Sequence, residues 1–385
     1  MATWGAIESA GTTWSDLEGI TWAELEEVCE KASSNIAQKD LEDREGKYPI
    51  YGASGLIKNV NFYQRESPYI AVVKDGAGVG RVMKLPAKSS VIGTMQYILP
   101  RDNVDIDYLA YAMEHMSLSK YYTGATIPHI YFKDYKSERL PLPPLEEQRR
   151  TAATLDKVSD LITKRRAQMD KLELLVKARF AEMFGDPVIN PYGWDTSDLI
   201  NLGECKNGMN FHTDDSGVII HCLGVGDFKD LSLIEDTSKL PTISLNEMPS
   251  DDYLLANGDI VFVRSNGNKA LVGRSVAVYP NDIPTTFSGF CIRFRIQNPA
   301  ILPSYLLRVL KTDSMRQKMA GRGANIQNLN QKILAELRIP IPGLALQEEY
   351  ELFIKKTDKS KLTIQQSLDK LETLKKSLMQ QYFGG

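Results

Sequence analysis

The stretch Arg139-Leu-Pro-Leu-Pro-Pro-Leu145 returns later in the chain as Arg338-Ile-Pro-Ile-Pro-Gly-Leu344, and this pair of segments decides how the sequence divides. The second copy begins 199 positions after the first, at residue 338 instead of residue 139. At the same offset, Gln148 matches Gln347. A constant offset kept over about sixty residues indicates a structural unit that occurs twice.

Each copy leads into a segment with the apolar spacing of a long helix. No Gly or Pro interrupts the chain from Leu145 to Phe184, and Gly185-Asp186-Pro187 then ends the helix. Alternating steps of three and four residues predict a coiled-coil stripe on each helix. The expected stripe positions are Leu155, Val158, Ile162, Met169, Leu172 and Val176 in the first helix, and Ile364, Leu368, Leu371, Leu374 and Leu378 in the second.

Two such stripes in one chain predict an antiparallel coiled coil, in which each helix buries its apolar side against the other. The alternative is two amphipathic helices that pack on separate domains. The segments before each helix are rich in short strands and turns. Residues 69–83 and 257–279 each show an apolar strand, a Gly-rich or Asn-rich turn and a second strand that begins near an arginine.

These patterns predict an α+β fold with a pseudo-twofold internal repeat, in which two globular domains are separated by two long helices. We expect a first domain over residues 1–144 and a central helix over 145–185. A second domain is expected over residues 186–344 and a C-terminal helix over 345–385.

Composition limits the class of protein. With 43% hydrophobic and 25% charged residues, the chain is typical of a soluble globular protein, and its apolar runs are too short to cross a membrane. The four cysteines lie far apart without a C-x-x-C pair, and the first residues lack a secretory signal, so we expect a cytoplasmic protein. The net charge is −3, but residues 308–338 carry seven Lys or Arg against two acidic residues. A basic face is therefore compatible with the composition.

Motifs typical of catalysis do not match. Asn190-Pro-Tyr-Gly-Trp194 lacks the second proline of an N-P-P-Y methyltransferase motif and favours a turn. Asp75-Gly-Ala-Gly-Val-Gly-Arg81 has neither dinucleotide-binding nor Walker spacing and also favours a turn. The histidines form no pairs at metal-ligand spacing, and His221-Cys222 favours a strand pair. We therefore expect no catalytic centre, no metal site and no cofactor.

The sequence resembles a known family at three places. Pro141-Leu-Pro-Pro-Leu-Glu-Glu-Gln148 leads into a long helix that ends Phe184-Gly-Asp-Pro-Val-Ile-Asn-Pro-Tyr-Gly-Trp194. Together with Lys47-Tyr-Pro-Ile-Tyr-Gly52 and the segment 258–268, this is similar to the specificity subunits of type I restriction–modification systems. The resemblance implies two target recognition domains that each read half of a split DNA site, and a helix pair that sets the spacing. It also implies docking of two adenine-methylating modification subunits, with restriction subunits in the full complex and no chemistry in this chain.

Candidates for reading DNA are polar and basic residues at turns, where a rigid scaffold can present them to a groove. Arg pairs bidentately with guanine and Asn with adenine, whereas Lys more often contacts phosphates. In the first domain the candidates are Tyr51, Ser54, Lys58, Asn59, Lys74, Arg81, Thr126 and His129. In the second domain they are Arg264, Asn266, Asn268, Lys269, Arg274, Arg322, Asn325, Gln327 and Asn328.

Two other interpretations stay open at this point. Any of these side chains can be an ordinary solvated turn residue, since Asn and Gly in turns often serve backbone geometry alone. The repeated domains can also form a scaffold that binds protein without reading DNA. Salt-dependent DNA affinity distinguishes the two, because phosphate contacts release counterions.

Overall fold

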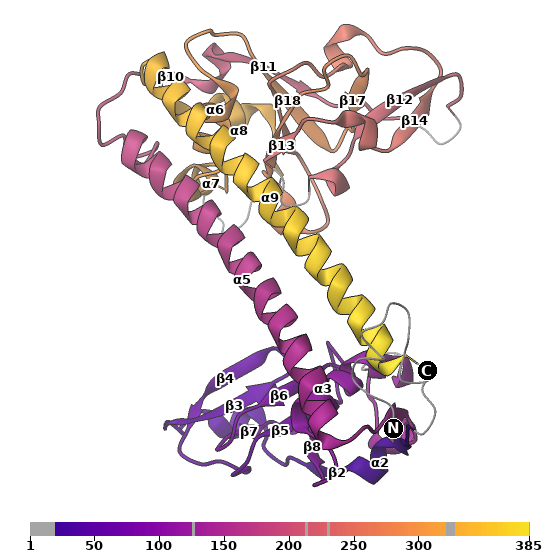
Figure 1. Ribbon diagram of the computed structural model, residues 1–385. Coiled ribbons are helices and arrows are strands. Elements are labelled where there is room, and N and C mark those ends of the chain that lie inside the picture. Colours follow the sequence, from indigo (N-terminus) through magenta and orange to yellow (C-terminus); the bar gives the residue numbers. More distant parts are fainter. Residues whose placement is uncertain (1–19, 125–127, 212–214, 229–231, 321–327, 385) are drawn as a thin grey trace. The chain divides into compact units, whose positions relative to one another are not determined.

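The computed structural model describes residues 20–124, 128–211, 215–228, 232–320 and 328–384, which form two compact units (Figure 1). The first unit combines residues 1–168 with residues 364–385, and the second consists of residues 169–363. Two long helices, α5 (Leu145–Phe184) and α9 (Leu344–Phe383), contribute a stretch to each unit. The two uninterrupted helices predicted from the sequence are therefore confirmed.

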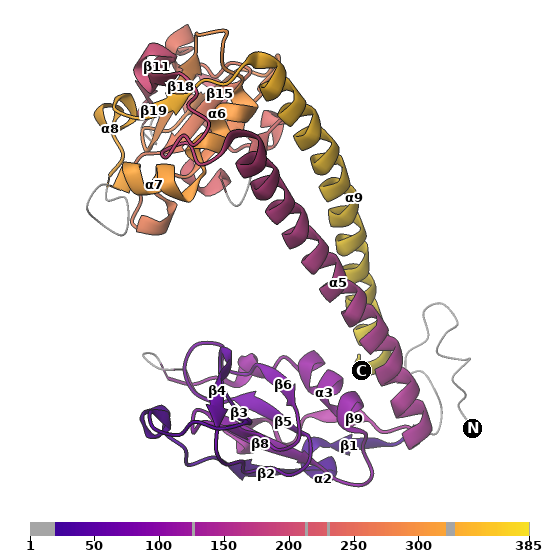
Figure 2. The ribbon, with the colours of Figure 1, turned by 90° about the vertical axis from the view of Figure 1, so that its left-hand side faces the viewer.

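The first unit is built around a four-stranded antiparallel sheet in the order β2 (Cys29–Ser33), β8 (Met95–Pro100), β5 (Tyr69–Val73) and β6 (Val82–Leu85). Helix α3 (Ile106–His115) packs on one face of this sheet (Figure 2). Smaller sheets join β3 (Tyr48–Gly52) to β4 (Gly55–Val60) and β7 (Ser90–Val91), and β1 (Trp22–Glu24) to β9 (Arg139–Pro141). The unit also contains the short helices α2 (Leu25–Val28) and α4 (Phe132–Tyr135).

The second unit repeats this plan with an additional strand. Its main sheet has the order β11 (Gly203–Asn207), β18 (Cys291–Ile296), β15 (Asp259–Val263), β16 (Ser275–Val278) and β13 (Leu233–Ile234). The smaller sheets join β12 (Val218–Leu223) to β14 (Thr242–Leu245) and β17 (Thr285–Phe287), and β10 (Thr196–Asp198) to β19 (Arg338–Pro340). Besides its stretches of α5 and α9, the unit contains the α-helices α6 (Pro303–Leu310), α7 (Asp313–Ala320) and α8 (Gln331–Ala335).

Each main sheet contains an inner strand that is buried on both faces, β5 in the first unit and β15 in the second, and we call these two the central strands. All five residues of β5 are buried, with Ile70 and Val72 in one apolar core and Tyr69, Ala71 and Val73 in another. Strand β15 is buried in the same way and divides between two cores of the second unit. This explains why both segments read as nearly continuous apolar runs.

The repeated glutamines fix the start of each long helix. Gln148 is 1% exposed, and its Oε1 accepts the Asp105 N–H at 2.8 Å while its Nε2 donates to the Pro143 carbonyl at 2.8 Å. Gln347 is fully buried and makes the equivalent bonds, with the Leu302 N–H at 2.9 Å and the Pro342 carbonyl at 2.8 Å. Each buried amide forms hydrogen bonds with backbone groups that are shielded from water and would otherwise have no partner. The offset of 199 therefore has a structural cause at these positions.

The long helices pair antiparallel within each unit. In the first unit Val158 and Ile162 of α5 pack with Leu368 of α9, and the Arg166 guanidinium contacts Glu372 at 2.7 Å. In the second unit Glu173 of α5 contacts Lys361 of α9. Arg179, which comes later in α5, contacts Glu349, which comes earlier in α9, as expected for antiparallel helices. Leu155 and Val176 are also buried, while Met169, Leu172, Ile364, Leu371 and Leu378 are half-buried.

Leu374 does not belong to this seam, and its predicted place in the stripe is wrong. It is 46% exposed, whereas Leu371 and Leu378 are half-buried and pack against Val158, Ile162 and Leu368. Leu371 and Leu378 are one heptad apart, and Leu374 lies beside them on the helix surface. The Lys375 Nζ reaches the Glu114 carboxylate of α3 at 2.9 Å.

Glu173 joins three elements of the second unit. Its carboxylate contacts Lys361 of α9 at 2.7 Å and Arg308 of α6 at 3.4 Å. Burial raises the pKa of Glu173, but the hydrogen bond and charge of Lys361, with the charge of Arg308, outweigh it and hold the pKa below its ordinary value. The ionised carboxylate therefore stabilises the fold.

We expect Glu173→Gln to lower the free energy of unfolding of the second unit by about 1 kcal/mol at neutral pH, a figure reduced for solvent screening. Because the folded pKa lies below the unfolded one, this contribution is complete above about pH 4.5 and is lost as the pH falls through the folded value. Hydrogen exchange of residues 169–363 at pH 7 and pH 4 measures both effects. Asp170→Asn on the same helix is the control, because the Asp170 side chain is exposed and forms no ion pair with a described residue. A loss that is the same at both pH values would contradict the ion-pair explanation.

Candidate nucleic-acid interface

Lys74 directly follows β5 and Arg264 directly follows β15, and the two residues make equivalent backbone hydrogen bonds. The Lys74 N–H donates to the Thr94 carbonyl at 3.0 Å, and the Lys74 carbonyl accepts the Ile130 N–H at 2.9 Å. The Arg264 N–H donates to the Phe290 carbonyl at 2.8 Å, and its carbonyl accepts the Leu329 N–H at 2.9 Å. Lys74 and Arg264 are therefore equivalent positions in the two units.

A second pair of cations closes the same loops. The carbonyl of Arg81 accepts the Val73 N–H at 2.9 Å, and the carbonyl of Arg274 accepts the Val263 N–H at 2.9 Å. The preceding residues, Gly80 and Gly273, have φ of +85° and +77°. A positive φ favours glycine and turns the chain back toward the sheet. The predicted correspondence of the two hairpins is confirmed in the pairing of β5 with β6 and of β15 with β16.

In the first unit, other segments converge on this loop. The Arg81 guanidinium donates to the Ala53 carbonyl at 2.9 Å, next to the exposed Ser54 in the turn between β3 and β4. Tyr51, at the end of β3, is half-buried. His129 forms a β-bridge with Asp75 in the loop and packs edge-on against Tyr131. Thr126 lies outside the described residues.

Lys58 and Asn59 lie farther along β4. The Lys58 Nζ donates to the carbonyls of Leu41 at 2.9 Å and Glu42 at 3.3 Å, so it supports a neighbouring segment of the backbone. Asn59 is exposed and pairs with Pro49 in the strand ladder. No described contact brings these two residues to the loop between Lys74 and Arg81.

In the second unit the loop is longer and carries its own polar tip. The Asn266 Oδ1 accepts the Asn268 N–H at 2.8 Å, and the Asn268 Oδ1 accepts the Ala270 N–H at 3.1 Å. These two side-chain oxygens therefore shape the turn, as Asn often does. Lys269 stands exposed beside them, and Asn328 is exposed next to Leu329. Arg322, Asn325 and Gln327 lie outside the described residues.

Exposed aromatic side chains beside the loops were missed in the sequence. Tyr122 and Tyr131 are 56% and 50% exposed in the first unit, and Phe290 is 61% exposed in the second. Phe290 provides the carbonyl that holds Arg264. Bases and the thymine methyl group offer flat or apolar surfaces to such side chains. Their position in polar, turn-rich segments is the signal that could have identified them.

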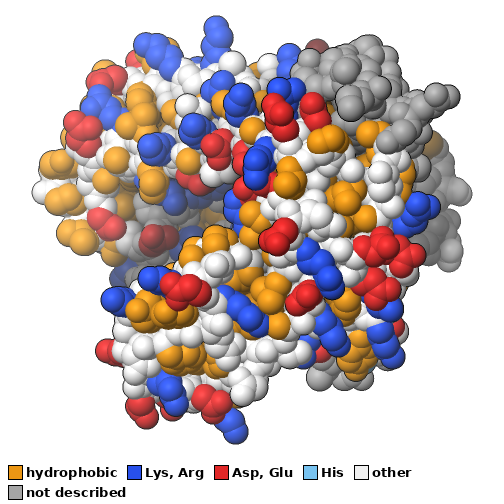
Figure 3. Space-filling view, turned by 60° about the horizontal axis from the view of Figure 1, so that its bottom comes forward, with side chains coloured by type: hydrophobic (Ala, Val, Ile, Leu, Met, Phe, Trp, Pro, Cys, Tyr) orange, Lys and Arg blue, Asp and Glu red, His pale blue; other side chains and the backbone are white. Residues whose placement is uncertain are grey.

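The basic segment 308–338 does not form one open face. Arg308 has a side chain only 12% exposed and contacts Glu173, while Arg338 donates to the Thr196 hydroxyl at 2.6 Å. Arg316 donates to the carbonyls of Gly273 at 3.1 Å and Val272 at 3.3 Å, at the base of the loop that ends in Arg274. On the face shown in Figure 3, Lys and Arg side chains are interspersed with Asp and Glu. The positive charges on the surface therefore form small local sites and not one continuous basic face.

Charges accumulate next to Arg274. Burial, together with repulsion from Arg274, lowers the pKa of Arg316. Burial also lowers the pKa of Lys311 to about 8; Glu173 opposes this shift, and Arg308, Lys361 and Arg274 add to it. The base of the second loop is thus an electropositive part of the second unit.

The four cysteine thiols are poor candidates for catalysis or metal binding. Burial raises the pKa of Cys205 to about 11 and those of Cys29 and Cys222 to about 12, and it also raises that of Cys291. These thiols stay protonated at neutral pH, which makes them poor nucleophiles and metal ligands. Among the residues that the structure describes, no three His, Cys, Asp or Glu are placed to hold a metal ion.

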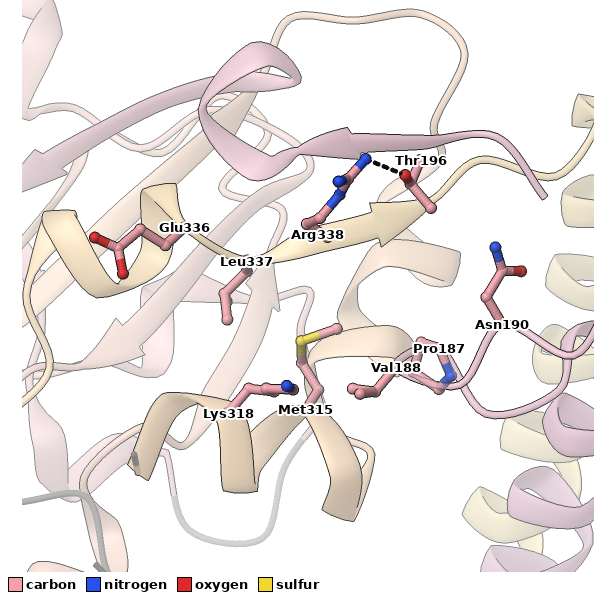
Figure 4. A pocket seen from close by; sticks show the side chains of 9 residues that line it. All are labelled: Pro187, Val188, Asn190, Thr196, Met315, Lys318, Glu336, Leu337 and Arg338. Carbon is pink, nitrogen blue, oxygen red and sulfur yellow. Dashed lines mark hydrogen bonds between the residues drawn. The ribbon is translucent and has the colours of Figure 1, made fainter. Parts of the chain in front are cut away.

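A cavity of about 520 Å³ in the second unit lies between the loop after α5, helix α7 and strand β19 (Figure 4). Its lining combines apolar side chains such as Met315 and Leu337 with Lys318, Glu336 and Arg338. None of the predicted DNA-binding residues lines it. No helix in the described part of the chain is long and apolar enough to span a bilayer.

Comparisons with known proteins identify the family of the chain. The pattern that defines the type I restriction modification DNA specificity domain matches residues 18–174 and 193–375. The chain is 23% identical over 372 residues to the type I restriction enzyme MjaVIII specificity subunit of Methanocaldococcus jannaschii, covering 88% of this chain and 85% of that protein. It is also 23% identical over 371 residues to the type I restriction enzyme StySPI specificity subunit of Salmonella potsdam, covering 87% and 78% of the two chains.

A solved structure shares the fold. The S subunit of a type I restriction–modification system from M. genitalium superposes with a TM-score of 0.60 at 16% identity, covering 95% of this chain and 97% of that one. The duplicated hairpins and the paired long helices occur in a chain whose two halves both match the same domain pattern. The chain therefore belongs to the family of type I restriction–modification DNA specificity proteins.

Proposed function

We propose that this chain is a non-catalytic specificity subunit that reads a bipartite double-stranded DNA site, with one half-site per recognition domain. The recognition domains cover residues 1–144 and 186–344, and the helices over 145–185 and 345–385 connect them. The equivalence of Lys74 with Arg264 and of Arg81 with Arg274 carries the proposal, because it presents two cations at one hairpin in each domain. In this proposal DNA is read by residues at and beside that hairpin in each domain.

The two half-sites differ in this proposal. The loop of the first domain contains only small residues and Asp75 between its cations, whereas the loop of the second contains Asn266, Asn268 and Lys269. Base edges in the major groove present different donors and acceptors for each base pair, so unlike side chains select unlike sequences.

The helix pair sets the distance between the half-sites and recruits partners. A helix of 40 residues is about 60 Å long, while one turn of DNA advances about 34–36 Å. Several leucines on these helices remain exposed beside the seam, which favours docking of partner helices. They are Leu161, Leu174, Leu175, Leu352, Leu362 and Leu374. The partners are two DNA adenine methyltransferase subunits, with restriction subunits in the full complex.

Single-molecule sequencing of adenine methylation tests this function. A host that expresses the chain with its modification subunit is compared with a host that expresses the modification subunit alone. We expect a new motif of two short, unlike blocks with a fixed gap. Absence of any chain-dependent motif, with an active and assembled methyltransferase, would favour a protein-binding scaffold.

A further inference from the structure

Comparison of the two similar domains distinguishes two kinds of DNA contact. This inference rests on the proposed function. The sugar–phosphate backbone is the same in both half-sites, whereas the bases differ. Positions that are equivalent in the two domains, in both backbone geometry and charge, therefore suit the constant part of the ligand. Positions that differ suit the variable part.

Four cations meet the first condition. Lys74 and Arg264 make the same pair of backbone hydrogen bonds, and Arg81 and Arg274 follow equivalent glycines of positive φ. Two of the side chains are further held by carbonyls, Arg81 by Ala53 at 2.9 Å and Arg264 by Gly289 at 3.4 Å. Such backbone contacts fix where each guanidinium lies before DNA arrives.

The residues between and beside these cations meet the second condition. The first loop has six residues between Lys74 and Arg81, and the second has nine between Arg264 and Arg274. The second loop presents the exposed Lys269 at its tip, while the first is bridged at Asp75 to His129, which packs against the half-exposed Tyr131. The two domains thus present different side chains on a common frame.

The surroundings of Arg274 favour an anion. Arg316 donates to the carbonyls of Val272 and Gly273, so its charge is held at the base of the same loop. Repulsion from Arg274 acts on both Arg316 and Lys311. A phosphate oxygen placed between these groups would offset this repulsion.

We propose that Lys74 and Arg81 in the first domain, and Arg264 and Arg274 in the second, bind DNA phosphates independently of sequence, while Lys269 and Tyr131 contact bases.

The test measures equilibrium binding of the full chain, alone and assembled with its modification subunit, to two duplexes over a range of salt concentrations. One duplex carries the motif found by methylation sequencing, and the other has both half-sites scrambled. Arg81→Gln and Arg274→Gln should each weaken binding to both duplexes about tenfold and reduce the slope of log affinity against log salt by about one. The methylated motif should not change.

Charge-conserving variants separate phosphate binding from base reading. Arg81→Lys and Arg274→Lys should recover most of the affinity, because a phosphate accepts an ammonium, whereas bidentate contact with guanine requires the guanidinium fork. Lys269→Ala and Tyr131→Ala should relax the motif in one half-site each. Arg101→Gln is the matched control, since Arg101 follows β8 at the opposite end of the sheet and its side chain is 49% exposed.

A motif that changes in Arg81→Gln or Arg274→Gln, or affinity that the lysine variants do not recover, would overturn the assignment to phosphates. The assignment would also be overturned if the unaltered chain binds DNA in a salt-dependent way but both glutamine variants have the same DNA affinity as Arg101→Gln. If the unaltered assembly binds neither duplex, the proposed function itself fails and this inference fails with it.

Discussion

Phe184→Ala is expected to lower the free energy of unfolding of the second unit by about 3–5 kcal/mol, as deletion of a buried aromatic ring usually does. Phe184 is 2% exposed at the last turn of α5. Its ring centroid lies 4.7 Å from that of Tyr305 and 5.4 Å from that of Tyr350, in edge-to-face geometry. The ring therefore joins α5 to α6 and to α9 within one core.

Hydrogen exchange of residues 169–363 measures this loss. Leu175→Ala on the same helix is the control, because Leu175 is 49% exposed and a surface truncation changes stability by about 0.5 kcal/mol or less. Phe383→Ala should act in the same way on the first unit, where the Phe383 ring lies 5.1 Å from that of Tyr108. Equal protection in Phe184→Ala and Leu175→Ala would show that the end of α5 contributes nothing to the second unit.

Insertion of seven residues into both long helices, after Gln168 and after Thr363, is expected to lengthen the gap of the recognised site by about three base pairs. The insertions fall where the two compact units divide, so the contacts within each unit are kept. Seven residues preserve the heptad phase and add about 10 Å of helix, and B-DNA rises about 3.4 Å per base pair. The two half-sites themselves should stay the same.

Methylation sequencing measures the new gap. Three base pairs also rotate one half-site relative to the other by about 100°, so we expect a lower extent of methylation at the new motif. The same insertion in α5 alone is the control and should abolish the motif, because the two helices then differ in length. An unchanged gap in the double insertion would contradict the proposal that the helices set the spacing.

Much of the fold could be predicted because it depends on local periodicity. The helix from Leu145 to Phe184 follows from an apolar stripe without Gly or Pro, and the paired hairpins follow from apolar runs around Gly-rich and Asn-rich turns. The place of Leu374 could not be predicted in this way. Leu371 lies three residues after Leu368, and Leu374 lies three residues after Leu371, so both fit the predicted spacing. Only packing against the partner helix decides which leucine of α9 enters the seam.

The candidate site could be predicted only in part. The sequence identified the turn residues Lys74, Arg81, Arg264 and Arg274, but it did not distinguish them from Lys58, whose ammonium is bonded to two carbonyls. It also overestimated the basic segment 308–338, because the partners of Arg308 and Arg338 come from distant parts of the chain. Hydrogen-bond partners far apart in sequence leave no local pattern.

By itself the sequence determined the duplication, the two long helices and the hairpins at which candidate residues gather. These features depend on spacing along the chain, which a repeat at a constant offset displays directly. Only the tertiary structure decided that Phe184 packs against Tyr305 and Phe383 against Tyr108, so that the end of each long helix completes the core of the unit that it enters. It also decided which cations are equivalent, because that equivalence includes backbone hydrogen bonds to segments distant in the sequence, those of Lys74 with Ile130 and of Arg264 with Leu329.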